Sequence, residues 1–180
     1  KATNMKMTAG VLPVFVYLFF GVAPDRSLAL WASALLGNVA FSTGAIMLWR
    51  RAIRQREAPD LALWRRINVA ATTVAGMAWA TGWVLLIPQS QGFELALLTG
   101  ILVTVCSVAS NTMASHPRSM QAFLVAALAP AAVVLFSHGG KSEGLLGLVM
   151  VCCLVSLTLI GRRASQVLLD RLTAQEQLRQ

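Results

Sequence analysis

The chain has 180 residues, of which 57% are hydrophobic and 12% are charged, and its formal net charge is +8. Soluble domains have roughly 45–50% apolar and about 25% charged residues, and a chain of this size could not bury the excess apolar surface. The composition therefore excludes a soluble globular domain and predicts an all-α, polytopic membrane protein. The basic charge does not indicate nucleic-acid binding, because no basic groove motif with stacking aromatic residues accompanies it.

Six apolar runs along the chain predict six transmembrane helices. A helix needs about 20 apolar residues to cross the hydrocarbon core of a bilayer, with roughly 17–25 usual. The first run is short and carries Pro13, so that it reaches a full span only if Lys6 extends to the interface. The runs are Met7–Val22, Leu28–Trp49, Asn68–Ile87, Glu94–Ala114, Met120–Ser137 and Gly144–Gly161. We therefore predict a six-helix transmembrane domain over residues 1–161.

The charges of the connections between these runs predict their orientation. Thirteen Lys and Arg residues fall on the side of both chain ends, and only Arg26 and Lys141 fall on the other side. Cytoplasmic connections carry the excess of basic residues in membrane proteins. Both ends are therefore predicted to be cytoplasmic, N-in and C-in. Trp49 and Trp64 flank the most basic connection, as expected for aromatic residues at the inner interface.

Polar and aromatic residues inside the predicted spans mark either helix contacts or a ligand pocket. The second span has an asparagine near its middle, and the fourth carries small and polar residues at spacings of four and three. Lipid cannot satisfy such groups, so they usually face other helices or a cavity. The third span carries two tryptophans, although tryptophan prefers interfaces. The candidate pocket residues are Asn38, Trp79, Trp83, Thr104, Ser107 and Asn111, and helix packing is the alternative role for all of them.

Few other residues carry chemistry. Pro130 lies in the middle of the fifth span and predicts a kink, which is either a fixed bend or a hinge. Cys106, Cys152 and Cys153 lie in apolar runs, so we expect packed or lipid-facing thiols, with redox or copper sensing as a minor alternative. No phosphate loop, Ser/His/Asp set or intramembrane carboxylate pair is present. We expect no active site, metal or cofactor in these 180 residues.

The segment 162–180 is polar and predicts a helix that leaves the membrane. Two arginines directly follow the last apolar run, and no proline or glycine interrupts the segment. Two leucines four residues apart share one helix face, either as a fragment of a coiled-coil dimer seam or as part of a solvated helix. The segment is predicted to begin a cytoplasmic signalling helix that leads to an output domain after Gln180. The predicted output residues are Arg162, Arg163, Leu168 and Leu172.

Three segments resemble a family of bacterial multi-pass sensor modules that precede histidine kinase or diguanylate cyclase domains. The segment Gly76–Pro88 is similar to that family's Gly-x-x-Trp-Gly pattern and outer proline, with Ala80 in place of the second glycine. The segment Ala114–Pro130 is similar to its short inner loop and proline-bearing span, and the residues from Gly161 onward resemble its exit into the signalling linker. The resemblance implies an inner-membrane sensor, usually dimeric, with a catalytic output domain. It implies no particular ligand.

The sequence thus favours a membrane-embedded sensory input domain of a bacterial signalling protein. Its outward connections are too short to form a folded binding domain, so we expect a lipophilic or other small-molecule signal that enters the membrane. The expected partners are membrane lipids, a second copy of the chain and this ligand, and the expected location is the bacterial inner membrane. A passive dimerisation anchor and a small transporter or channel are the alternatives, although transporters usually place an ionisable residue at mid-membrane.

Overall fold

The structure is a computed structural model that describes residues 17, 24–54, 60–90, 92–113 and 116–177. Apart from Tyr17, the first predicted span, Met7–Val22, lies outside the described residues. The described part of the chain is helical throughout its elements, without strands. Its elements are α2 (Asp25–Arg54), α3 (Leu61–Leu86), the 3-10 helix η1 (Ile87–Gln89), α4 (Phe93–Thr112), α5 (Pro117–Ser137) and α6 (Lys141–Gln177).

The five α-helices of the described part are each long and apolar enough to cross a membrane. The second to sixth predicted spans are thereby confirmed as helices, but several helices extend beyond their apolar runs. Helix α2 continues to Arg54, and α3 begins at Leu61, ahead of the predicted Asn68. The early start of α3 has a local cause: Asp60 Oδ1 accepts hydrogen bonds from the backbone N–H groups of residues 62 and 63, at 2.9 and 3.2 Å. Such an N-cap satisfies donors that the first turn leaves open.

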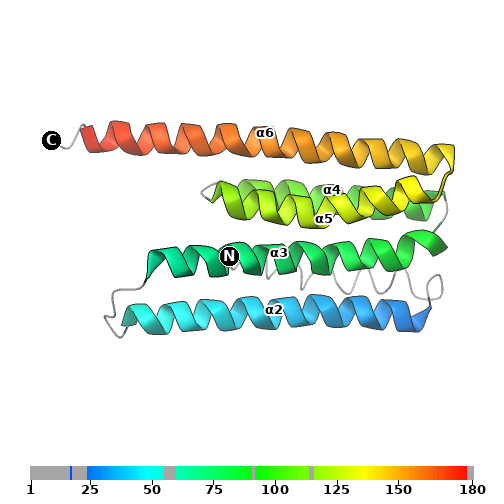
Figure 1. Cartoon of the computed structure of the whole chain (residues 1–180), viewed down its shortest axis with the longest axis horizontal. Helices are drawn as coiled ribbons and strands as arrows, with labels where there is room; N and C mark the ends of the chain where they lie inside the picture. The colour runs from blue at the N-terminus through cyan, green and yellow to red at the C-terminus, as the bar shows by residue number, and fades with distance from the viewer. Residues whose placement is uncertain (1–16, 18–23, 55–59, 91, 114–115, 178–180) are drawn as a thin grey trace.

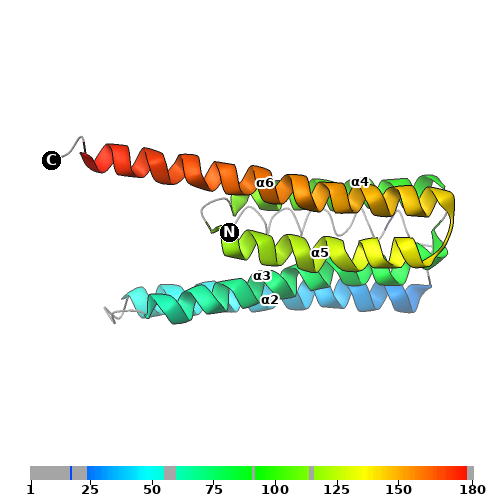
Figure 2. The same cartoon turned by 45° about the horizontal axis from the view of Figure 1, so that its top comes forward.

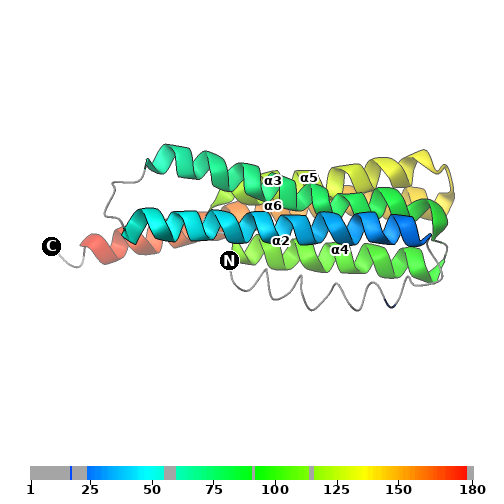
Figure 3. The same cartoon turned by 90° about the horizontal axis from the view of Figure 1, so that it is seen from below.

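The helices lie side by side along one long axis, with α2 and α6 at opposite edges and α3 and α5 between them (Figure 1). Helix α3 packs mainly against α5 and α2, while α5 packs against α3 and α6. Helix α4 packs against α5 and α6, and Figure 2 shows it beside α6. Seen from below, α3 and α4 are displaced to opposite sides of α2 (Figure 3). Helices α3 and α5 therefore form the centre of the described bundle.

The seam between α3 and α5 is closed by small residues. A Cβ atom at Gly76 would lie 2.6 Å from the backbone oxygen of Phe123 and 2.8 Å from the Cβ of Ala126, so only glycine permits this approach. Ala78 and Gly82 are also buried, but Gly82 lies against Trp31 of α2 and not against α5. Small residues allow transmembrane helices to pack closely, because lipid supplies no hydrophobic force that would otherwise hold them together. Small residues thus let α3 approach α5 closely at Gly76 and α2 closely at Gly82.

The two ends of the bundle differ in charge and in length. We call one the basic end; its described arginines are Arg50, Arg51, Arg54, Arg65, Arg66, Arg118, Arg162, Arg163 and Arg171. The opposite end carries Arg26 and Lys141 as its only described basic residues. The late part of α6, the end of α2 and the start of α3 all extend past α4 and α5 on the basic side (Figure 1). The described charges are therefore segregated in the way that the connections predict.

Candidate functional site

The predicted pocket residues of α2 and α3 lie in the core of the bundle. Trp79 is 4% exposed and Trp83 is fully buried. The indole of Trp31, from α2, meets that of Trp79 edge to face, with ring centroids 6.1 Å apart. The same indole fills the space beside Gly82, where a Cβ atom would lie 2.5 Å from Trp31 Nε1. Trp31 is fully buried, and this packing requires the glycine of the facing helix.

Asn38 is the third predicted pocket residue in the core. It lies on α2 and is 9% exposed. Its side-chain oxygen, Oδ1, is buried and has no hydrogen-bond partner among the described residues. Buried polar atoms are nearly always hydrogen-bonded, because a lost bond to water costs free energy unless it is replaced. Asn38 therefore presents a buried acceptor to which a donor group can bind.

The predicted residues of α4 lie elsewhere. Thr104 and Asn111 are exposed, and Ser107 is half-buried, because α4 turns its leucines toward the core instead. The hydroxyl groups of Thr104 and Ser107 donate to backbone carbonyls one turn earlier in α4, each at 2.8 Å. A hydroxyl group satisfied by its own helix can face lipid at little cost. The structure thus distributes the six predicted residues over the core, the outer surface of α4 and one groove.

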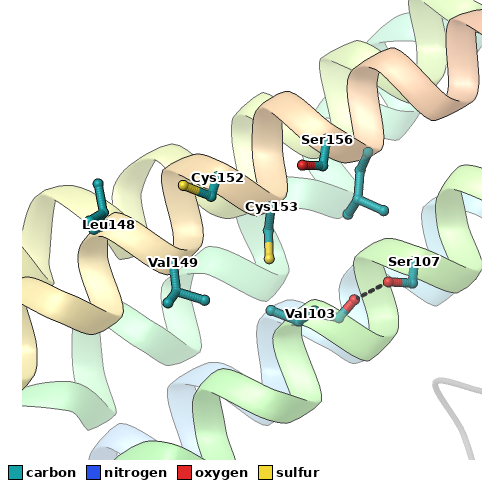
Figure 4. A pocket seen from close by; sticks show the side chains of 8 residues that line it. Val103, Ser107, Leu148, Val149, Cys152, Cys153 and Ser156 are labelled. Carbon is teal, nitrogen blue, oxygen red and sulfur yellow. Dashed lines mark hydrogen bonds between the residues drawn. The ribbon is translucent and has the colours of Figure 1, made fainter.

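That groove lies between α4 and α6 and has a volume of about 350 Å³. In Figure 4, Val149 and Cys153 point from α6 toward Val103 of α4, whereas Cys152 points away. Two adjacent residues of a helix are about 100° apart, so the two thiols cannot share one direction. The lining is mainly apolar; its residues are Val103, Ser107, Leu148, Val149, Cys152, Cys153, Ser156 and Leu157. The groove therefore suits an apolar molecule better than a charged one.

A second arrangement, which we call the α5–α6 junction, lies where α6 extends past the bundle. It joins Ser119, Met120 and Gln121 of α5 to Gly161 and Arg162 of α6. The carboxamide oxygen of Gln121 accepts two hydrogen bonds from Arg162, from Nε at 2.9 Å and from Nη2 at 3.2 Å. This orientation of the amide is assigned from donor–acceptor pairing, since the opposite one would turn its NH₂ group toward guanidinium donors. The sequence predicts an output role for Arg162, and the structure adds its partner.

Close packing of Met120 against Gly161 also holds α5 and α6 together at the junction. Met120 is fully buried, and a Cβ atom at Gly161 would overlap its Sδ atom, so the two helices touch at this point. One turn later Ser165 is buried, and its hydroxyl group donates to the carbonyl oxygen of Gly161 at 2.8 Å. Helix α6 therefore stays in contact with α5 up to the turn in which its arginines begin.

The junction also reaches α3. Asn68 Nδ2 donates a hydrogen bond of 2.7 Å to Ser119 Oγ, and Ser119 is 3% exposed. Sequence reasoning missed both residues, because a polar residue near the end of a span looks like an ordinary interfacial residue. A usable signal is their position, since Asn68 opens the predicted third span and Ser119 directly precedes the fifth. Residues of α3, α5 and α6 thus meet around one turn of α5.

The other predicted residues have no described contact that assigns them a role. Arg163 is exposed, and Pro130 lies within α5, which continues to Ser137. Leu168 and Leu172 lie on α6, four residues apart. Within the described ranges, no group of three or more His, Cys, Asp or Glu residues could hold a metal ion, and the three cysteines are free thiols.

The fold defines an all-helical protein with five described helices able to cross a membrane. No family model, curated protein or solved structure shows a significant match to the chain. Function is therefore inferred from the groove, the junction and the length of α6.

Proposed function

We propose that this chain is a membrane-embedded sensory input domain of a bacterial signalling protein, which relays a signal through α6 to a cytoplasmic output domain. The observation that carries the proposal is that α6 is one uninterrupted helix of 37 residues. At 1.5 Å per residue its length is about 55 Å, whereas the hydrocarbon core of a bilayer is about 30 Å thick. The excess leaves the membrane as a rigid continuation of the last span, so a displacement inside the membrane is carried outside it.

The direction of this extension supports a cytoplasmic output. Helix α6 extends from the basic end (Figure 1), and basic residues mark the cytoplasmic side of membrane proteins. Trp49 and Trp64 pack edge to face at this end, with ring centroids 4.8 Å apart, as suits the interfacial level of the bilayer. The bacterial inner membrane, with the basic end inward, is the location that follows.

The groove between α4 and α6 is the proposed entry point for the signal. Its volume of about 350 Å³ lies in the lower part of the 300–1,000 Å³ range of ligand pockets. Leu148, Val149, Cys152 and Ser156 of its lining are exposed, so a molecule dissolved in the bilayer reaches it from the side. A lipophilic molecule in the groove contacts α6 directly. It shifts the output only if it binds one arrangement of α6 better than another.

The output is proposed to be the control of a histidine kinase or diguanylate cyclase domain. Such domains act as pairs, and the part of α6 around Leu168 and Leu172 is the proposed dimer seam. Two leucines at this spacing make only a fragment of a coiled coil, which needs three or four heptads for stability. We therefore expect this seam to be too weak to hold the dimer by itself, so that small displacements of α6 can change its pairing.

An insertion series in α6 tests this proposal. One to four alanines would be inserted after Ala164 in the chain joined after Gln180 to a diguanylate cyclase reporter, and cyclic dinucleotide production would be measured in cells. Each inserted residue rotates everything beyond it by about 100°, so the output should change with one or two alanines and return toward its starting value with four. The same insertions between Gly139 and Gly140 are the matched control. They lie ahead of α6, so the reporter output should not change periodically with the number of inserted residues.

A reporter output that ignores the position of insertion would contradict the proposal. It would favour a passive membrane anchor, which needs only to hold two output domains together. Substrate flux into proteoliposomes that contain this chain alone would instead establish a transporter or channel.

A further inference from the structure

We infer that the first turn of α5 is a transmission element, which couples the position of α3 to the position of the output helix α6. This inference rests on the proposed function of α6 and names the residues that set its position at the point of exit. Asn68 on α3 and Gln121 on α5 are assigned as positioning residues. Neither is proposed to touch the signal molecule.

The geometry of the turn carries the inference. Ser119, Met120 and Gln121 are consecutive, and consecutive residues of a helix point about 100° apart. Ser119 accepts the hydrogen bond from Asn68 of α3, and Gln121 accepts the two hydrogen bonds from Arg162 of α6. Met120 fills the space between them and is fully buried. Because the three residues belong to one rigid turn, a displacement of α3 at Asn68 moves the group that holds Arg162.

These contacts differ from most polar contacts of the bundle. The hydroxyl groups of Thr72, Thr99, Thr104, Ser107 and Ser110 all donate to carbonyl oxygens of their own helices. Such bonds are unaffected when one helix moves relative to another. The hydrogen bonds of Ser119 and Gln121 instead join α5 to α3 and to α6. They are therefore stretched or broken when one of these helices moves relative to another.

The start of α5 has no side-chain cap. Its N-cap residue, His116, makes no side-chain capping hydrogen bond, and Pro117 follows as the first helical residue. The first turn of a helix leaves backbone N–H groups without intrahelical partners, and a side-chain cap normally satisfies some of them. Here the turn is held by the neighbouring helices through its side chains. A turn held in this way follows its neighbours more readily than the middle of α5, which is clamped against α3 at Gly76.

Two adjacent arginines supply a control within the molecule. Arg162 and Arg163 are both exposed and have the same charge, but only Arg162 has a described hydrogen bond to α5. If net charge at the membrane surface positions α6, the two residues are equivalent. If the junction positions α6, only Arg162 matters.

Pulsed electron paramagnetic resonance on the full chain in lipid nanodiscs tests the inference. Spin labels on encoded keto amino acids at positions 51 and 171, both exposed, would report the distance from α2 to the projecting part of α6 and leave the native cysteines intact. Asn68→Ala and Ser119→Ala remove the same hydrogen bond from opposite sides, so either variant suffices if the other folds poorly. Each should shift or split the distance distribution, although the hydrogen bond that is removed joins α3 to α5 and not to α6.

Matched controls separate transmission from general loosening. Thr73→Val removes a hydroxyl group near Asn68 that bonds only within α3, and it should leave the distribution unchanged. Arg163→Ala should have no effect, whereas Arg162→Ala and Gln121→Ala should shift the distribution. Gln121→Glu replaces the single carboxamide oxygen with a carboxylate that can accept both guanidinium hydrogen bonds, so it should retain the wild-type distribution.

The combined variant tests transmission most directly. Coupled residues give non-additive effects, so Asn68→Ala should add no further shift once Gln121→Ala has released α6. The inference is overturned if Asn68→Ala and Ser119→Ala leave α6 in place, or if Arg163→Ala acts as strongly as Arg162→Ala. If these variants leave α6 in place while the alanine insertions still give a periodic output, only the transmission step fails. If these variants shift the spin-label distance but the alanine insertions give no periodic change in reporter output, the signalling role of α6 is refuted. The mechanical coupling between α3 and α6 would then still hold.

Discussion

The seam between α3 and α5 and the seam between α4 and α6 are built from similar apolar residues but pack differently. In the most apolar stretch of α3, and likewise of α5, 50% of the residues are buried, against 17% in α6. At the first seam Gly76 brings the backbones together, and at the second a groove of about 350 Å³ remains beside Ser107. Inside a bilayer the stability of a seam depends on close packing, since lipid is as apolar as the side chains. The α3–α5 seam is therefore the more tightly packed of the two, and the α4–α6 seam is the one at which we propose that a ligand enters and α6 moves.

The largest expected effect comes from adding one methyl group to the closed seam. Gly76→Ala places a Cβ atom against the backbone of Phe123, which cannot move without shifting α5. We expect a loss of about 2–3 kcal/mol in the free energy of unfolding, at the upper end of the cost of overpacking. Unfolding by sodium dodecyl sulfate in mixed micelles, followed by circular dichroism, measures this loss.

Gly100→Ala is the matched control for this substitution. Gly100 lies on α4 with nothing within 4 Å of its added Cβ atom, so the change should not lower the free energy of unfolding. Alanine is also the better helix former. Equal losses at the two positions would mean that the α3–α5 seam is no tighter than the surface of α4.

The sequence predicts the helices of both seams well but not the faces that they bury. The length of an apolar run determines whether it can span a bilayer, so the second to sixth runs were recognisable. Which side of α4 faces the core was not, because Leu98 and Leu102 are as compatible with lipid as with protein. Hydroxyl groups such as that of Thr104 bond to their own helix and can therefore face outward. In α3 the glycines do mark packing faces, against α5 at Gly76 and against α2 at Gly82, because a residue without a Cβ atom allows close approach.

The junction shows a different limit of sequence reasoning. Arg162 stands out because it follows an apolar run, and the run of helix-forming residues after it predicts a continuous α6. Its partner Gln121 lies 41 positions earlier (162 − 121), in a helix whose rotation the apolar pattern does not define. The pairing depends on which turn of α5 faces α6, and that is decided by Met120 packing at Gly161. Only the folded arrangement contains this information.

A smaller effect of opposite sign is expected at Asn38 in the core. Its buried oxygen has no partner in the described part of the chain, so Asn38→Leu removes an unsatisfied acceptor while keeping a similar volume. We expect the free energy of unfolding to rise by about 1 kcal/mol, as for removal of an unpaired buried polar group. Ser33→Ala is the control on the same helix; its hydroxyl group bonds to the carbonyl oxygen of Ala29, and the change should be nearly neutral.

The response of the cyclase reporter to a signal is a second measurement on the Asn38→Leu variant. If a polar ligand group donates to Asn38, the stabilised variant should lose its response in the cyclase reporter. A lower stability would show that the asparagine is already satisfied in the folded protein. That result would assign Asn38 to helix packing, the alternative that the sequence analysis gives for it.

The smallest expected change in stability comes from filling the groove, and here the informative quantity is the output. Ser107→Trp places an indole in the open groove between α4 and α6, so the free energy of unfolding should change by less than about 0.5 kcal/mol. The lost hydroxyl group bonds only within α4 and leaves no partner in another helix. Because the indole occupies the proposed signal site, the reporter output should move to a constant level and no longer respond to lipophilic compounds.

Thr104→Trp is the control, since Thr104 lies one turn away on the exposed face of α4. It should keep both the basal output and the response. Equal behaviour of the two variants would exclude the groove as the entry point, because an indole outside the groove would then act as well as one inside it. The expected result is that the α4–α6 seam accepts an indole at almost no cost in stability, while the α3–α5 seam rejects a methyl group. That difference is what a sensor requires, because only a seam that tolerates new volume can convert a bound molecule into a displacement of α6.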